Sequence, residues 1–133
     1  MSDQAIVSEA QLEKLIPHFY GIVRTDPLLG PVFNDAVGDW PEHLERLVAF
    51  WSSVMLTSGR YKGNPMAAHL KHGARITPEM FARWLALWGR ATAEILPPNL
   101  AGALQAKATR IAESLSLGLF FRLSPAGPRG EAA

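Results

Sequence analysis

The chain has 133 residues, with 13 Lys and Arg against 12 Asp and Glu, so its formal net charge is +1. This length fits a single domain that buries roughly two-thirds of its unfolded surface, and a hydrophobic content of 48% argues against wholesale disorder. The small net charge gives no broad electrostatic footprint for nucleic acid. The sequence contains no Cys, which excludes a disulfide framework, a thiolate nucleophile and a Cys-based zinc site.

The first ten residues, MSDQAIVSEA, lack the basic start and the apolar run of a secretory signal. No stretch approaches the roughly 18 uninterrupted apolar residues that a membrane-spanning helix requires. We therefore expect a soluble, cytoplasmic protein.

The first predicted helix begins at a capping-box pattern, Ser8 with Gln11, and continues with apolar residues at helical spacing over 12–23. Pro17 lies inside this run, and we expect it to kink the helix or to start a second helix near that point. The following segment, 26–31, contains two prolines and a glycine. It is predicted to be a non-helical corner that ends at Phe33.

Further helix starts are marked by a capping residue close to a proline. The predicted helices run from Asp39 to about Gly59, from Asn64 to Gly73, and from Thr77 to the Pro97-Pro98 pair. Asn99 is predicted to cap a last helix, whose expected core residues are Leu100, Leu104, Ile111, Leu115 and Leu119. No segment has a convincing strand pattern, so the predicted fold class is all-α.

The predicted helix that follows Asn64 is unusually short. A helix of about eight residues is not stable by itself, so either tertiary packing or a strong bond to a ligand must hold it. It carries His69 and His72, which are three residues apart and share a face. The residues alone allow either histidine to be a ligand, or both to bind zinc, although the lack of nearby acidic or Cys ligands argues against zinc.

Few polar side chains with coordinating or donor groups interrupt the apolar faces of the predicted helices. They are Tyr20, His43, His69, His72, Trp84 and Trp88. Two helices that each present an imidazole could enclose a flat metallo-macrocycle, and haem iron commonly takes a proximal histidine. Taken singly, a histidine on a helix is more often a surface or core residue, and a tyrosine or tryptophan at helical spacing is more often core. Only the joint pattern favours a site.

An ordered set of residues resembles the third class of bacterial truncated haemoglobins over about residues 12–120. The set is Phe19-Tyr20, Asp26-Pro-Leu-Leu-Gly-Pro-Val-Phe33, Trp40, His43-Leu44, Phe50-Trp51, Tyr61-x-Gly63-x-Pro65-x-x-x-His69 and Phe81-x-x-Trp84-Leu85. The resemblance implies a two-over-two helical sandwich around a haem. We expect a single truncated-globin domain over residues 1–123 and a disordered tail over 124–133.

The resemblance also implies a role for individual residues. His69 matches the proximal iron ligand, and the distal ligand-binding face comprises Tyr20, His43, Leu47 and Trp84. The residues expected to contact haem b are Phe33, His43, Arg46, Leu47, Tyr61, His69, Arg75 and Trp84. Arg46, Tyr61, Lys62 and Arg75 compete as partners of the haem propionates. Trp51 would lie further along the same wall, and Trp88 is interpreted as a core residue.

The expected function is reversible binding of dioxygen, nitric oxide or carbon monoxide at a pentacoordinate haem iron, with a role in oxygen transport. Because bound dioxygen carries partial negative charge, the Tyr O–H and Trp N–H groups are suitable donors in a dry pocket. One alternative is a haem enzyme with peroxidase-like or nitric-oxide-detoxifying activity, in which His43 acts as acid or base toward peroxide. Another is a helical interaction domain without a cofactor. A reductase partner stays unidentified, and we expect a monomer or weak dimer.

Overall fold

The computed structural model describes residues 6–120, and every regular element in that range is an α-helix. The helices are α1 (Glu9–Thr25), α2 (Gly30–Ala36), α3 (Trp40–Leu56), α4 (Pro65–Leu70), α5 (Pro78–Ile95) and α6 (Pro98–Phe120). This confirms the predicted all-α class. The proposed domain boundary at 123 and the tail over 124–133 lie outside the described residues. None of the helices within 6–120 is long and apolar enough to cross a membrane.

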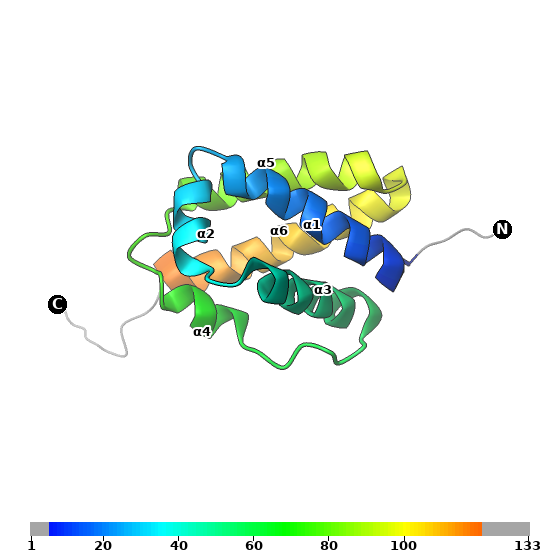
Figure 1. Ribbon diagram of the computed structural model, residues 1–133, viewed down its shortest axis with the longest axis horizontal. Helices are drawn as coiled ribbons and strands as arrows, with labels where there is room; N and C mark the ends of the chain where they lie inside the picture. The colour runs from blue at the N-terminus through cyan, green and yellow to red at the C-terminus, as the bar shows by residue number, and fades with distance from the viewer. Residues whose placement is uncertain (1–5, 121–133) are drawn as a thin grey trace.

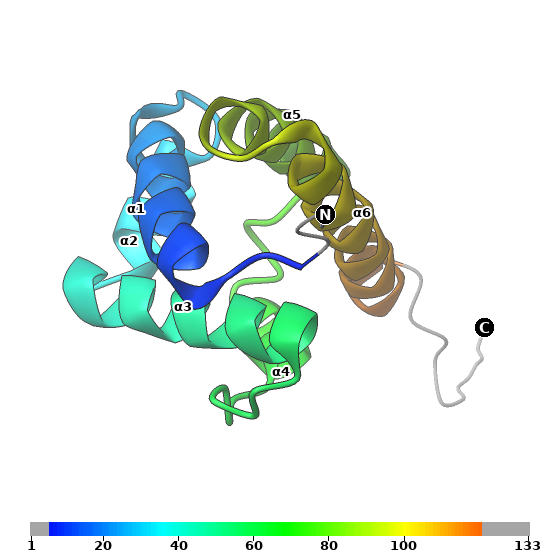
Figure 2. The same ribbon diagram turned by 90° about the vertical axis from the view of Figure 1, so that its right-hand side faces the viewer.

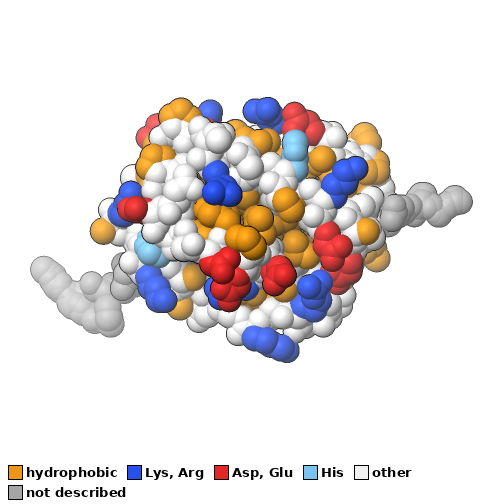
Figure 3. All heavy atoms as spheres, viewed as in Figure 1, with side chains coloured by type: hydrophobic (Ala, Val, Ile, Leu, Met, Phe, Trp, Pro, Cys, Tyr) orange, Lys and Arg blue, Asp and Glu red, His pale blue; other side chains and the backbone are white. Residues whose placement is uncertain are grey.

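Two pairs of long helices form the body of the fold. Figures 1 and 2 show α1 and α3 on one side and α5 and α6 on the other, with α2 beside the end of α1. Helix α1 packs against both α3 and α5, while the short α4 packs against α6. On the face shown in Figure 3, hydrophobic side chains gather in the middle and charged side chains lie around them.

Aromatic side chains join the two helix pairs in the centre of the core. Trp51 of α3 stacks on Trp88 of α5 with ring centroids 4.6 Å apart, and Phe19 of α1 meets Trp88 edge-on at 4.8 Å. Trp88 is completely buried, and its indole N–H donates to the carbonyl oxygen of Leu104 in α6 at 3.1 Å. Trp88 is therefore a core residue, as predicted, and it contacts three other helices.

Helix α1 begins as predicted, and it continues past Pro17 as a single helix. The Ser8 hydroxyl accepts the N–H of Gln11, and the Gln11 side chain accepts the N–H of Ser8. Pro17 does not start a second helix, because α1 runs without interruption through it. Proline removes only one hydrogen bond from the helix, and the completely buried Ile16 and Phe19 on either side keep this segment packed as one helix.

The predicted corner over 26–31 is shorter than expected. Only residues 27–29 form a turn, and α2 starts at Gly30, so Phe33 lies within a helix and not at the end of a corner. Pro31 occupies the first turn of α2, where its missing N–H costs no intrahelical hydrogen bond. A proline that looks like a helix breaker in the sequence therefore marks a helix start.

The capping residues of the three middle helices are confirmed. The side-chain oxygens of Asp39, Asn64 and Thr77 accept backbone N–H groups three residues later, at 3.1, 3.1 and 3.3 Å respectively. These bonds satisfy donors that would otherwise be unpaired at the start of α3, α4 and α5.

Some predicted helix ends are displaced. Helix α3 ends at Leu56, followed by Thr57 in a left-handed conformation with φ of 53°, close to the expected end at Gly59. Helix α4 stops at Leu70 and continues as turns. The predicted cap at Asn99 is wrong, because α6 already begins at Pro98 and places Asn99 inside its first turn.

Asp26 connects the corner between α1 and α2 to α5. Its side chain is 2% exposed, and its carboxylate accepts the N–H groups of Leu28 and Leu29 at 3.0 and 2.9 Å. It also receives two bonds from the Arg83 guanidinium, at 2.7 and 2.6 Å. The Arg83 guanidinium holds the pKa of Asp26 below its ordinary value. Burial acts in the opposite direction, and the two backbone bonds lower the pKa further.

Replacing Asp26 with Asn removes the charge-assisted bonds to Arg83 and should lower the free energy of unfolding at pH 7 by about 1 kcal/mol. The loss is modest because Arg83 is half-exposed and solvent screens its charge. Since the folded-state pKa is lowered, this stabilisation is present above the unfolded-state value of about 3.9 and is lost as the pH falls below it. Urea unfolding at pH 7 and pH 3 should show the difference between wild type and Asp26→Asn shrinking at pH 3.

The matched control is Asp35→Asn, which removes a carboxylate that is 71% exposed and pairs with Arg75. We expect it to change stability little at either pH. An equal loss in both variants would contradict a special role for the Asp26 bonds.

Candidate functional site

The packing of α1 against α5 brings Tyr20 and Trp84 into contact. Tyr20 is 4% exposed, and the indole of Trp84, whose N–H can only donate, lies close enough to the Tyr20 hydroxyl group to influence its pKa. Burial raises the pKa of Tyr20 to about 12, and the Trp84 indole acts in the opposite direction. Tyr20 is therefore a neutral phenol at pH 7. Because the Trp84 indole is a donor and not an acceptor, the proton of the Tyr20 hydroxyl group is available to another acceptor.

Three rings from α2 and α3 surround the Tyr20 ring. The centroids of Phe33, Trp40 and His43 lie 5.8, 6.1 and 6.4 Å from that of Tyr20. Leu47 lies one turn beyond His43 on α3 and packs against the core. The tertiary structure thus brings two of the predicted distal residues, His43 and Trp84, next to the buried Tyr20.

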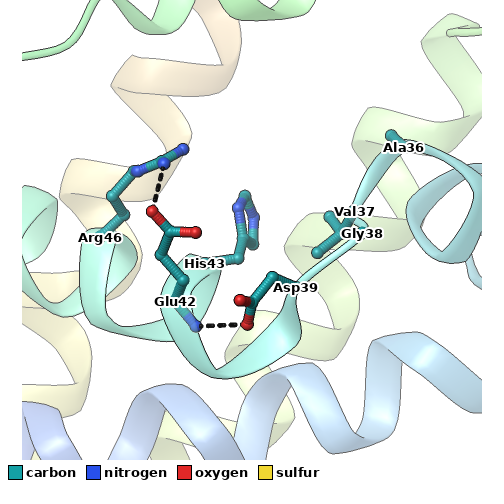
Figure 4. Close-up of a pocket in the computed structure, with 7 residues that line it drawn as sticks. All are labelled: Ala36, Val37, Gly38, Asp39, Glu42, His43 and Arg46. Atoms are coloured by element: carbon teal, nitrogen blue, oxygen red, sulfur yellow. Dashed lines mark hydrogen bonds and ion pairs between the residues drawn. The ribbon is translucent and has the colours of Figure 1, made fainter.

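His43 lies between this group of rings and the surface. Figure 4 shows its ring in a hollow of about 170 Å³ that is bordered by residues 36–39, Glu42 and Arg46. Arg46 donates to Glu42 at 3.0 Å on the wall of this hollow. Burial, and to a lesser extent the positive charge of Arg46, lowers the pKa of His43. His43 is therefore neutral at pH 7 and can donate a hydrogen bond through one ring nitrogen and accept one through the other.

His69 lies on α4, the short helix that packs on α6. In this contact the Met66 side chain of α4 covers Gly118 of α6. The Nδ1 atom of His69 lies 2.7 Å from the carbonyl oxygen of Pro65. A carbonyl can only accept, so Nδ1 carries the proton and Nε2 keeps its lone pair. Metal-binding histidines are typically oriented by such a bond. The half-buried His69 is thus prepared to coordinate a metal through Nε2.

A second, larger hollow adjoins α4. It has a volume of about 420 Å³ and is lined by Arg46, Ala49, Arg60, Tyr61, Lys62, Gly63, Asn64 and Ala68. Ala68 precedes His69, so the hollow lies next to the helix that carries the candidate metal ligand. Three of its lining residues, Arg46, Tyr61 and Lys62, were predicted to bind propionates. Guanidinium, ammonium and phenol groups are suitable partners for carboxylates.

The fourth predicted propionate partner, Arg75, does not line this hollow, and its guanidinium pairs with Asp35 at 2.6 Å. Conversely, Arg60 lines the hollow although the sequence analysis did not select it. The run Arg60-Tyr61-Lys62 in the connection between two capped helices is the signal that could have identified it.

The arrangement of these residues suits a haem. Within residues 6–120, no cluster of three or more His, Asp or Glu side chains could hold a metal ion, whereas haem iron needs only an axial protein ligand. The chain offers one imidazole with a free Nε2, a buried Tyr-Trp donor pair, and a cationic hollow beside the imidazole helix. These are the donor types that the iron, an iron ligand and the propionates require.

Comparison with known proteins decides the family. No family model matches the chain. The chain is 36% identical over 86 residues to the group 3 truncated haemoglobin of Campylobacter jejuni, and this stretch covers 62% of this chain and 67% of that protein. The chain belongs to the group III truncated haemoglobins.

The tertiary structure agrees with this assignment. The crystal structure of a group III truncated haemoglobin from Campylobacter jejuni has a TM-score of 0.78 to this globin at 28% identity. The similarity covers 96% of this chain and 100% of the other. The predicted family and truncated-globin fold are therefore confirmed, and the chain is a globin that binds haem and small ligands.

Proposed function

We propose that this globin reversibly binds dioxygen and other diatomic ligands at a pentacoordinate haem b iron, with His69 as the proximal ligand and Tyr20 and Trp84 as the distal donors. The observation that carries the proposal is the buried hydroxyl group of Tyr20 beside the indole N–H of Trp84. An indole N–H can only donate, so the buried phenol keeps its own proton for donation to a ligand of the iron. The haem supplies the iron at which the ligand binds.

Tyr20 supplies the main distal donor in this proposal. Its raised pKa keeps the phenol protonated, so it donates a hydrogen bond and does not compete as a phenolate for the iron. Such a donor favours a ligand that accumulates negative charge, as dioxygen does. Donation from Trp84 polarises the Tyr20 O–H and strengthens its own donation, since linked hydrogen bonds are cooperative.

Apolar side chains complete the distal pocket. Phe33 and Leu47 are partly buried and pack against the core, and the Phe33 ring lies next to that of Tyr20. We infer that they exclude water from the bound ligand, which increases the electrostatic value of the Tyr20 hydrogen bond and slows oxidation of the iron.

The larger hollow, which cationic side chains line, is the place where the haem propionates would bind. We assign them to Arg46, Tyr61 and Lys62, because these residues line one hollow beside α4. Arg75 stays a prediction outside this assignment, since it does not line the hollow beside α4.

Removing the proximal imidazole provides the first test. His69→Ala should weaken haem retention and abolish the wild-type ferrous spectrum, because α4 would lose its bond to the iron. The visible spectra of the ferric, ferrous and carbon-monoxide-bound protein report the ligation directly. His72→Ala, three residues away, is the matched control and should keep wild-type spectra. The reverse result would make His72 the ligand.

His43 is expected to be a mobile gate or an auxiliary donor, because it lies between the Tyr20 ring and the hollow of Figure 4. His43→Leu should therefore change the association rates of carbon monoxide and dioxygen by more than it changes their dissociation rates. Flash photolysis and stopped-flow mixing measure the two rates separately. A rise in dissociation with unchanged association would identify His43 as the main stabiliser instead.

Tyr20→Phe keeps the ring and removes only the hydroxyl group. A hydrogen bond to a partly charged acceptor contributes about 1.5–3 kcal/mol, so dioxygen dissociation should accelerate roughly tenfold to hundredfold. Carbon monoxide, which carries less charge when bound, should respond much less. Stopped-flow displacement of each ligand measures both effects in the same protein.

The double variant Tyr20→Phe, Trp84→Phe addresses compensation. Loss of the Tyr20 hydroxyl frees the Trp84 N–H, which could then donate to the ligand itself, so the single variant can understate the contribution of Tyr20. Adding Trp84→Phe should expose the full loss. If dioxygen dissociation is unchanged in both variants, Tyr20 is a packing residue and the distal pair does not bind the ligand.

A further inference from the structure

The connection between α3 and α4, residues 57–64, has no regular structure, yet it provides most of the polar side chains in the larger hollow. Two adjacent serines of α3 hold it. The Ser53 hydroxyl accepts the backbone N–H of Tyr61 at 2.8 Å. The Ser52 and Ser58 hydroxyl groups are hydrogen-bonded at 2.7 Å, and Ser58 also accepts the N–H of Arg60 at 3.3 Å. Side chains of a neighbouring helix thus replace the backbone bonds that a regular element would have.

Glu9, the first residue of α1, completes this network. Its two carboxylate oxygens bind different partners, one the completely buried Ser52 hydroxyl at 2.5 Å and the other the Arg60 guanidinium. This fixes the carboxylate from two sides and places the Arg60 head group at the wall of the hollow. A guanidinium has five N–H donors, so Arg60 can keep its bond to Glu9 and still bind a second carboxylate.

The Tyr61 ring is confined as well. It meets the Phe50 ring edge-on with centroids 5.3 Å apart. On the other side its hydroxyl group lies over Gly63, where an added Cβ atom would be 2.4 Å from the phenol oxygen. Any larger residue at 63 would displace the phenol, so Gly63 and Phe50 together define where the Tyr61 hydroxyl group lies.

We propose that Glu9, Ser52 and Ser53 are positioning residues that hold residues 58–63 as a preformed cradle for the carboxylate groups of the cofactor. The proposal rests on the haem-binding function proposed above and extends it to residues that do not touch the haem. A segment ordered in advance does not lose conformational freedom when the anion binds. Retention of the haem therefore depends on side chains of α1 and α3 outside the hollow.

The first test is haem release to an excess of an apoglobin acceptor, followed by absorbance, for wild type, Ser53→Ala and Glu9→Gln. Each variant loses one anchor, so release should be about threefold to tenfold faster. Ser114→Ala, which changes an exposed serine of α6 outside this network, is the matched control and should release haem at the wild-type rate. The same measurement is repeated with haem dimethyl ester, whose propionates carry no charge. With the ester, the ratio of variant to wild-type rates should fall to about one, since there is no carboxylate for the cradle to hold.

The second test measures how well residues 58–63 are held in place, through their resistance to proteolysis. Trypsin cleaves after Arg60 and Lys62, both in the connection. In the haem-loaded protein, Ser53→Ala and Glu9→Gln should accelerate cleavage at these bonds, detected by mass spectrometry, while Ser114→Ala should not. This readout does not depend on ligand binding.

Specific results would overturn the proposal. If Ser53→Ala accelerates release of the ester as much as that of haem, the network stabilises the fold as a whole and not the carboxylate site. If Glu9→Gln slows haem release, Glu9 competes with the propionates for Arg60. Unchanged release and cleavage in both variants would also refute it. In all three cases wild type still holds haem with a spectrum that depends on His69, so failure of the cradle is distinguishable from failure of the proposed function.

Discussion

The contact between α1 and α5 is the constraint on which the site depends. The edge-on contact of Phe19 with Trp88 sets the spacing of these helices in the dry centre of the core, and both rings are completely buried. One residue along α1 and one turn back along α5, the same contact places Tyr20 against Trp84. A change that displaced either helix would therefore affect both the packing of the core and the proposed distal donors. The core and the proposed ligand-binding face are thus built from neighbouring residues of the same two helices, adjacent in α1 and one turn apart in α5.

The two sides of the site, one around Tyr20 and one beside α4, differ in burial and in charge. On the side of Tyr20, neutral donors are buried among rings, where a low local dielectric makes each hydrogen bond strong and a charged group costly. On the side of α4, cations line an open hollow and keep contact with water. This division matches the chemistry of a haem, which has an apolar macrocycle and charged carboxylates at one edge. The ion pairs of Arg46 with Glu42 and of Arg60 with Glu9 limit the positive charge that the hollow accumulates.

Much of the fold could be predicted because its signals are local. Capping side chains at Ser8, Asp39, Asn64 and Thr77 act on backbone groups only three residues away, so the sequence shows both partners. The errors arose at prolines. Pro17 lies within a continuous helix and Pro31 begins one, because burial and the position of the proline in the first turn outweigh its intrinsic effect. The role of Arg60 was missed since its partner, Glu9, lies 51 residues away.

The sequence by itself determined the all-α class, the starts of α1, α3, α4 and α5 and the identity of the family, since periodicity, caps and an ordered set of residues are all one-dimensional features. Only the tertiary structure decided which polar groups meet. The approach of Trp84 to Tyr20, the orientation of His69 by Pro65, the pairing of Arg75 with Asp35 and the anchoring of residues 58–63 each depend on the direction of a side chain. Hydrogen bonds and ion pairs are short-ranged and directional, so a pattern of residues can nominate their partners, but only packed helices bring donor and acceptor within reach.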